Sequence, residues 1–85
     1  MTFTLRTGVS CAETDYGTAL LDEESGEYWE LNPTGGQVLR TLLAGGTPEE
    51  AVRELIRDYD VDDGGAREDV RQLVEALESS GLVER

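Results

Sequence analysis

Carboxylates are the main side chains of this sequence that could do chemistry. The 85 residues include 19 Asp and Glu, seven Arg, a single cysteine and no histidine. Histidine is the commonest general base and a common metal ligand, so its absence removes most acid–base and zinc chemistry. Cys11 has neither a histidine to activate it nor a second cysteine to share a metal, and no serine has a partnered base. We therefore expect no enzymatic activity, no resident metal and no cofactor.

One acidic segment, DYDVDDGGARED, has the spacing of a calcium-binding loop over part of its length. Counted from Asp58, acidic residues occupy the first, third and fifth positions. The sixth position, where such loops need glycine, is Asp63, and the twelfth is Asp69 in place of a bidentate glutamate. The segment therefore predicts a solvated link between two helices and no tight calcium site.

The formal net charge of −12 limits the partners of the chain. An acidic domain gains nothing from releasing phosphate counterions, so nucleic acid is not an expected partner. The acidic side chains either form a solvated surface or attract a partner rich in Lys and Arg. No apolar run is long enough to cross a membrane, and the first residues, MTFTLRTGVS, lack the apolar stretch of a signal peptide. We therefore expect a cytoplasmic protein that does not bind membranes.

The first third of the chain has the pattern of a three-stranded antiparallel sheet. Apolar or small residues alternate with polar ones over residues 3–11, which places Phe3 and Cys11 on one half-buried face. Residues 17–22 (GTALLD) predict a second strand, EESG a turn, and residues 27–31 (EYWEL) a third strand.

Three helices with clear start and stop signals follow. The first begins at Asn32, a good N-cap, with Pro33 as its first residue, and it ends at Gly45-Gly46. The second begins with a capping box at Thr47–Glu50, and the third follows the link DVDDGG. Each helix has an apolar face: Val38, Leu39, Leu42 and Leu43 in the first, Val52, Leu55, Ile56 and Tyr59 in the second, and Val70, Leu73, Val74 and Leu77 in the third.

This order of elements predicts an α+β fold in a single domain over residues 1–85, with the sheet in residues 1–31 and three helices in residues 33–85. Two other small modules fit poorly. An acyl carrier needs an attachment serine within Asp-Ser-Leu at the start of a helix, and the sequence has none. A DNA-binding helix-turn-helix needs a basic recognition helix, whereas the third helix has more acidic than basic residues.

Three segments together resemble one known family. They are YWELNPTG with the apolar helix after it, GGTPEEAVRELIRDY, and EDVRQLVEALESSGLV. In this order and spacing, over about residues 16–83, they are similar to the PqqD-like domain, also called the RiPP recognition element. The resemblance implies a winged helix-turn-helix-like fold with a three-stranded antiparallel sheet followed by three helices.

The resemblance also implies a function. Members of this family bind the leader region of a ribosomally made precursor peptide, as a strand added to the edge of the third strand and in a cleft against the third helix. The resemblance is greatest to the discrete leader-binding proteins of lasso-peptide clusters, which implies a separate cysteine leader peptidase and a cyclase as partners. Two alternatives stay open: a PqqD-like chaperone of another pathway, such as pyrroloquinoline quinone or radical-enzyme systems, and an acidic winged-helix interaction or transcription-type domain.

The candidate leader-binding residues come from two segments. The third strand contributes residues 27–31, and the third helix contributes a stripe that we expect to be exposed beside the strand, while Leu73 and Leu77 are core. Trp29 is interpreted as a core residue, as a lining of the cleft, or as both. The full set is Glu27, Tyr28, Trp29, Glu30, Leu31, Arg67, Val70, Arg71 and Val74.

Roles within this set follow from side-chain chemistry. Apolar leader side chains are expected to enter a cleft made by Trp29, Val70 and Val74, while Arg67 and Arg71 hold leader carboxylates at its rim. On this interpretation Val74→Asp abolishes leader binding without unfolding the domain, because a charge in the cleft cannot be desolvated cheaply.

Overall fold

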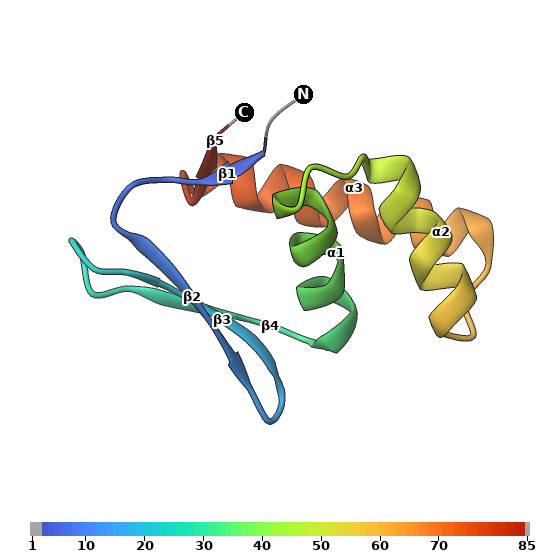
Figure 1. The fold of residues 1–85 in the computed structure, drawn as a ribbon, viewed down its shortest axis with the longest axis horizontal. Coiled ribbons are helices and arrows are strands. Elements are labelled where there is room, and N and C mark those ends of the chain that lie inside the picture. The colour runs from blue at the N-terminus through green and yellow to red at the C-terminus, as the bar shows by residue number, and fades with distance from the viewer. Residues whose placement is uncertain (1–2, 85) are drawn as a thin grey trace.

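The computed structural model describes residues 3–84, which form five strands and three helices (Figure 1). In chain order the elements are β1 (Thr4–Leu5), β2 (Val9–Thr14), β3 (Gly17–Asp22), β4 (Tyr28–Leu31), α1 (Pro33–Leu43), α2 (Pro48–Asp58), α3 (Asp63–Ser79) and β5 (Val83–Glu84). The α+β fold, with an antiparallel sheet of three strands followed by three helices, is confirmed.

The main sheet is an antiparallel meander in the order β2-β3-β4. Cys11 pairs with Leu20 across β2 and β3, and Leu20 pairs with Trp29 across β3 and β4. The prediction of one continuous strand over residues 3–11 is wrong. Thr7 and Gly8 form a turn in which Gly8 adopts a φ of +93°, and this turn separates β1 from β2.

The environment of Cys11 also differs from the prediction. The side chain is exposed and not half-buried as predicted, like most of β2, which forms the outer edge of the main sheet. Partial desolvation, with Glu13 nearby, raises the pKa of the Cys11 thiol and so disfavours the reactive thiolate.

A second, two-stranded sheet joins the ends of the described chain. Strand β5, which the sequence analysis did not predict, pairs antiparallel with β1. Arg6 fastens this small sheet to the meander, because its guanidinium donates to the Gly81 carbonyl at 2.7 Å and to the Asp22 carboxylate at 2.7 Å. The segment predicted to hold only helices therefore ends in a strand.

The three helices begin where their capping residues predict. The Asn32 side chain accepts a hydrogen bond from the Gly35 N–H at 2.8 Å, and the Thr47 hydroxyl accepts one from the Glu50 N–H at 3.1 Å. The third helix begins earlier than the glycine pair in the link suggested. Asp62 caps it by accepting from the Gly65 N–H at 2.6 Å, so the second half of the link is helical.

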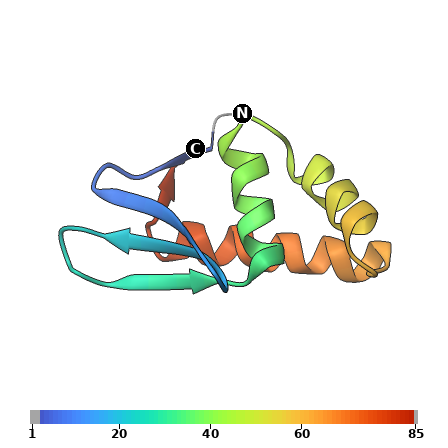
Figure 2. The same cartoon turned by 60° about the horizontal axis from the view of Figure 1, so that its bottom comes forward.

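The core lies where α1 packs between the sheet and the other two helices. Figure 2 shows α3 running lengthwise, with its C-terminal half beside the sheet and its N-terminal half beside α2. Leu20, Leu39 and Leu42 are almost fully buried at the centre. Ile56, predicted to lie on the apolar face of the second helix, is 39% exposed, because it lies at the edge of the face that Val52 and Leu55 bury.

Two further observations concern the part of the chain that the structure describes. None of its helices combines the length and the hydropathy that crossing a membrane requires. Within residues 3–84, no three His, Cys, Asp or Glu side chains are grouped so that they could hold a metal ion.

Candidate functional site

Strand β4 is an edge strand of the main sheet. It pairs with β3 on one side, and no strand among residues 3–84 pairs with its other side. The Asp22 N–H donates to the Glu27 carbonyl at 2.9 Å, which fixes the phase of the ladder. Hydrogen-bonded pairs alternate in an antiparallel sheet, so the backbone groups of Trp29 and Leu31 face β3. The N–H and C=O groups of Tyr28 and Glu30 therefore point to the free edge.

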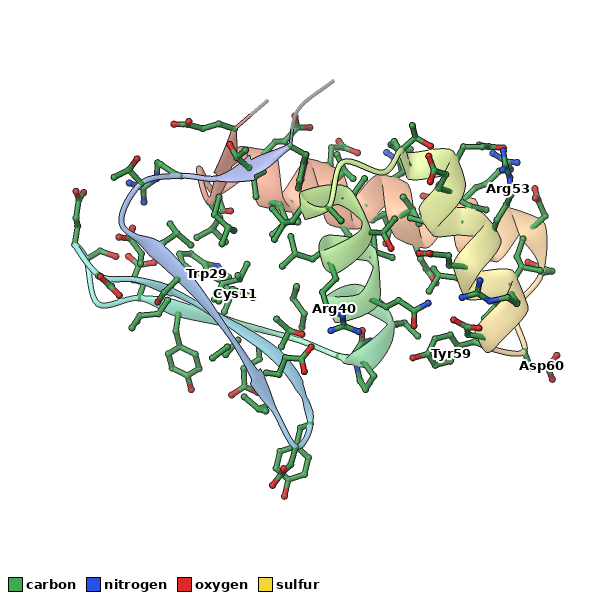
Figure 3. The ribbon with its side chains drawn as sticks, viewed as in Figure 1. Cys11, Trp29, Arg40, Arg53, Tyr59 and Asp60 are labelled. Carbon is green, nitrogen blue, oxygen red and sulfur yellow. The ribbon has the colours of Figure 1, made fainter. Side chains whose placement is uncertain are left out.

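The side chains of β4 alternate between two faces of the sheet. Trp29 and Leu31 lie on the face that packs against the helices, where they contact the buried core (Figure 3). Tyr28 and Glu30 lie on the outer face, and Tyr28 is 64% exposed. Both interpretations of Trp29 thus remain compatible, since a half-buried indole packs on the core and still borders the free edge.

An open depression of about 370 Å³ lies at the end of β4, and we call it the strand-side depression. Its floor is apolar and its rim carries amide, hydroxyl and carboxylate groups. It is formed by the end of β4, the start of α1, one residue of α2 and one side of α3: Leu31, Asn32, Thr34, Gly35, Val38, Leu55, Asp69, Gln72 and Leu73. Leu31 belongs to both the edge strand and the depression, so a peptide paired with β4 would place alternate side chains at its mouth.

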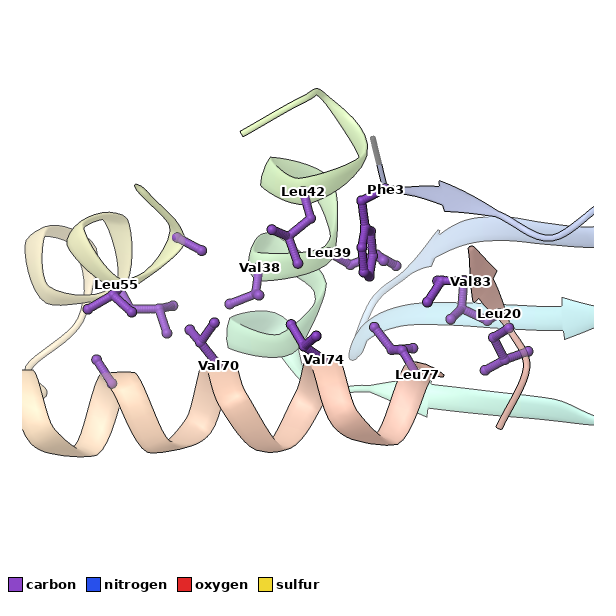
Figure 4. Close-up of a cluster of buried hydrophobic side chains, with 14 residues drawn as sticks. Phe3, Leu20, Val38, Leu39, Leu42, Leu55, Val70, Val74, Leu77 and Val83 are labelled. Atoms are coloured by element: carbon purple, nitrogen blue, oxygen red, sulfur yellow. The ribbon is translucent and has the colours of Figure 1, made fainter. Parts of the chain in front are cut away.

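The valines of α3 lie elsewhere. Val70 is 2% exposed and Val74 is 8% exposed, and both point from α3 into the core toward α1 (Figure 4). The prediction that they form an exposed stripe is wrong, and Leu73, predicted to be fully core, is half-buried at the strand-side depression. The helix is rotated relative to the expectation, so that its valines face inward and Leu73 borders the open side.

Arg67 and Arg71 are engaged in ion pairs on the far side of α3. The Arg67 guanidinium forms two hydrogen bonds with the Glu49 carboxylate of α2, both at 2.6 Å, and a third with Asp63 at 2.7 Å. Arg71 bridges Glu68 and Glu75 along its own helix, at 2.5 Å each. Exposed pairs of this kind each contribute little to stability, but the bidentate geometry orients the guanidinium.

These ion pairs alter the titration of their members. The hydrogen bond from Arg67, opposed in part by desolvation, holds the pKa of the Glu49 carboxyl below its usual 4.5. The hydrogen bond to Glu49, followed by that to Asp63, raises the pKa of Arg67 still further above its usual range. Glu49 and Arg67 are therefore both charged at neutral pH. The guanidinium groups of Arg67 and Arg71 are each already bound by carboxylates of this chain.

Arg67, Val70, Arg71 and Val74 line a second depression, of about 360 Å³, which we call the helix-side depression. It lies between α3 and the start of α2 and is completed by Pro48, Glu49, Val52, Glu75 and Glu78. A helix turns about 100° per residue, so Arg67 and Arg71 each project from α3 about 160° away from Asp69. The structure therefore brings Leu31, at the end of the predicted strand, together with Leu73, while the predicted α3 stripe lines a different depression that contains none of residues 27–31.

The charge near β4 is negative. Glu30 lies on the strand, Asp69 lies at the strand-side depression, and no arginine among the described residues lines that depression. The arginines at 40 and 53 lie on other surfaces, where Arg40 pairs with Glu13 of β2 at 2.9 Å (Figure 3). The sequence analysis did not predict the polar residues at the rim of the strand-side depression, which are Asn32, Thr34, Asp69 and Gln72.

Comparison with known proteins assigns the chain to a family. The sequence pattern of the family described as "Coenzyme PQQ synthesis protein D (PqqD)" matches residues 17–83, which is most of the chain. This chain belongs to the PqqD family. The match begins at β3 and ends at β5, so it includes the free edge strand and the whole of α3.

Two solved structures are similar to this PqqD-family chain over nearly all of its length. One is described as "Lasso peptide synthetase B1 complexed with the leader peptide", with 39% identity, complete coverage of both chains and a TM-score of 0.91. The other is described as "TbiB1 in Complex with the TbiA(beta) Leader Peptide", with 30% identity, coverage of 95% of this chain and 94% of that chain, and a TM-score of 0.83. No curated protein sequence matches this chain.

Proposed function

We propose that this protein binds the leader region of a ribosomally synthesised precursor peptide by adding it as a strand to β4. The observation that carries the proposal is the free edge of β4, with outward N–H and C=O groups at Tyr28 and Glu30, in a chain 39% identical to a lasso peptide synthetase B1 that was solved with a leader peptide. Strand addition takes affinity from backbone hydrogen bonds and specificity from alternate side chains.

The role of the protein in this proposal is that of an adaptor without catalysis of its own. The leader pairs along Glu27–Leu31, its inward side chains enter the strand-side depression against Leu73, and the modifying enzymes act on the rest of the precursor. A separate cysteine leader peptidase and a cyclase are the partners expected in a lasso-peptide pathway. In this proposal, leader binding takes place in the cytoplasm, where ribosomes make the precursor.

The side chains of the site support peptide binding over catalysis or DNA binding. The described residues near β4 offer apolar surface, an amide, a hydroxyl and a carboxylate, and no nucleophile beside a base. The surface of α3 that faces solvent bears acids that neutralise its two arginines, which disfavours contact with a phosphate backbone.

Titration of a labelled leader tests the proposal. The probe is a synthetic peptide covering the leader of the precursor encoded nearest the gene for this chain, and fluorescence polarisation reports its binding. We expect saturable binding that a core-peptide segment of the same precursor does not compete, and no change in the mass of the peptide after incubation with the protein alone. Absence of binding, or cleavage of the precursor by the protein alone, contradicts the proposal.

A further inference from the structure

The strand-side depression holds one carboxylate that the rest of the protein does not use. Within residues 3–84, the Asp69 carboxylate makes no hydrogen bond or ion pair, although it lines the depression beside Leu31 and Leu73. Other acids on α3 are engaged: Asp63 pairs with Arg67, and Glu68 and Glu75 pair with Arg71. Asp69 thus differs from these neighbours in lacking a cation, and it is the acidic residue that lines the strand-side depression.

The surroundings of Asp69 offer it no arginine. Arg67 and Arg71 project from the opposite side of α3, and each is bound by two carboxylates. Gln72 and Thr34 share the rim, but the Thr34 hydroxyl donates to Asn32 at 2.9 Å. A carboxylate in this position gains most from a ligand that brings its own positive charge.

We propose that Asp69 is a specificity-determining residue that selects a Lys or Arg side chain on the bound peptide. The selected residue lies opposite Leu31, because a strand added to β4 places that side chain on the helix face of the sheet. Its methylene stem packs on Leu31 and Leu73, and its cationic head reaches Asp69 at the rim. This inference rests on the proposed function, and it adds the chemistry of one leader side chain.

A random peptide library tests this selection without knowledge of the natural leader. Displayed peptides long enough to pair along β4 are selected on the wild-type protein, on Asp69→Asn, on Asp69→Lys and on Glu75→Gln. Glu75→Gln is the matched control, since it removes one negative charge from the same helix on the side away from β4. Circular dichroism and thermal melting verify that each variant is folded, and Asp69 is exposed, so its replacement leaves the core intact.

We expect wild type and Glu75→Gln to enrich one Lys or Arg position among apolar anchors, Asp69→Asn to lose that enrichment, and Asp69→Lys to enrich Asp or Glu there. With one selected peptide, Lys→Gln at that position should weaken binding to wild type by about fivefold and binding to Asp69→Asn far less. Selected peptides that show no enriched Lys or Arg position overturn the inference, and so does the same Lys or Arg enrichment on wild type and on Asp69→Asn. Either result leaves the proposed function standing. A tyrosine in place of the cation overturns the inference as well. A library that yields no peptide pairing with β4 contradicts both proposals.

Discussion

The two sides of α3 differ in how far the protein has already satisfied them. On the side facing α2, two arginines are held by four carboxylates, and the valines beside them are buried. On the side facing β4, Leu73 is half-buried, Asp69 lacks a partner within the described chain, and the neighbouring strand has an unpaired edge. Residues that are engaged inside a protein stabilise it, whereas groups left unsatisfied beside each other are the ones available to a ligand.

The comparison separates residue type from residue availability. Arg67 and Arg71 are the kind of residue that binds carboxylates, and they bind those of their own chain. The helix-side depression, which they line, also has an apolar floor, and its volume is about that of the strand-side depression. No strand edge lies among the residues that line it. Of the two sides of α3, as far as residues 3–84 show them, only the strand side combines apolar surface with free backbone donors and acceptors.

The largest expected effect breaks the closed side. Val74→Asp buries a charge at a position that is only 8% exposed, so it should destabilise the fold by about 3 kcal/mol. Urea denaturation followed by circular dichroism measures the loss. Val74→Ala, which removes methyl groups without adding charge, is the control and should cost less. A Val74→Asp protein as stable as wild type that fails to bind leader would restore the original cleft and contradict the account.

The next effect breaks the open side at the backbone. Glu30→Pro removes an N–H that points to the free edge, which a proline in an edge strand can do without disturbing the ladder to β3. A leader carbonyl then loses its donor, and binding should weaken by about 2 kcal/mol, roughly thirtyfold. Glu30→Gln keeps the N–H and removes only the charge, so it should bind the leader much more tightly than Glu30→Pro. Equal affinity of the two variants in a polarisation titration would show that this N–H is not used.

A smaller effect sharpens the comparison at the side chains. Leu73→Ala reduces the apolar surface of the strand-side depression and should weaken leader binding about tenfold, with a loss of fold stability of about 1 kcal/mol. Val52→Ala, at the helix-side depression, should lower stability more and affinity less, because Val52 is 3% exposed and lies away from β4. Leader titration measures the loss of affinity of each variant, and urea denaturation measures its loss of stability. The reverse order would place the leader on the α2 side.

The smallest effect concerns the ion pairs of the closed side. Arg67→Gln should leave leader affinity unchanged and lower the melting temperature slightly at neutral pH. Arg67 lowers the pKa of Glu49 in the folded state, so its contribution is present above the usual value of 4.5 and is lost as pH falls through the lowered pKa. The difference in melting temperature between wild type and Arg67→Gln should therefore shrink as pH is lowered from 7 toward 3. A difference that grows on acidification would contradict this assignment.

Local sequence signals predicted much of the fold, and packing decided the rest. The caps at Asn32 and Thr47 are local, since each side chain bonds a backbone N–H three residues away, and the helices begin there. The pairing of β5 with β1 joins opposite ends of the chain. Each strand is only two residues long, so neither has a pattern from which the pairing could be predicted. The turn at Gly8 was missed because period-two alternation continued across it.

The site was predicted in part for a related reason. The strand predicted over residues 27–31 follows from alternation and from its place before a helix cap, and the structure shows it as Tyr28–Leu31, at a free edge. The face of α3 was misjudged because Val70, Leu73, Val74 and Leu77 form one broad stripe, and either border could face the sheet. Which border does so depends on the packing of α1 and α2 against α3, a tertiary contact that helical spacing alone does not encode.

Amide hydrogen exchange with and without leader tests the central claim most directly. The N–H groups of Tyr28 and Glu30 point to the free edge, so they should exchange quickly in the free protein and become protected when the leader pairs with β4. The N–H groups of Trp29 and Leu31 bond to β3 and should be protected in both states. Protection of Tyr28 and Glu30 on adding leader is the predicted result. Unchanged exchange at both residues, with new protection around Glu49 and Arg67 instead, would contradict the account.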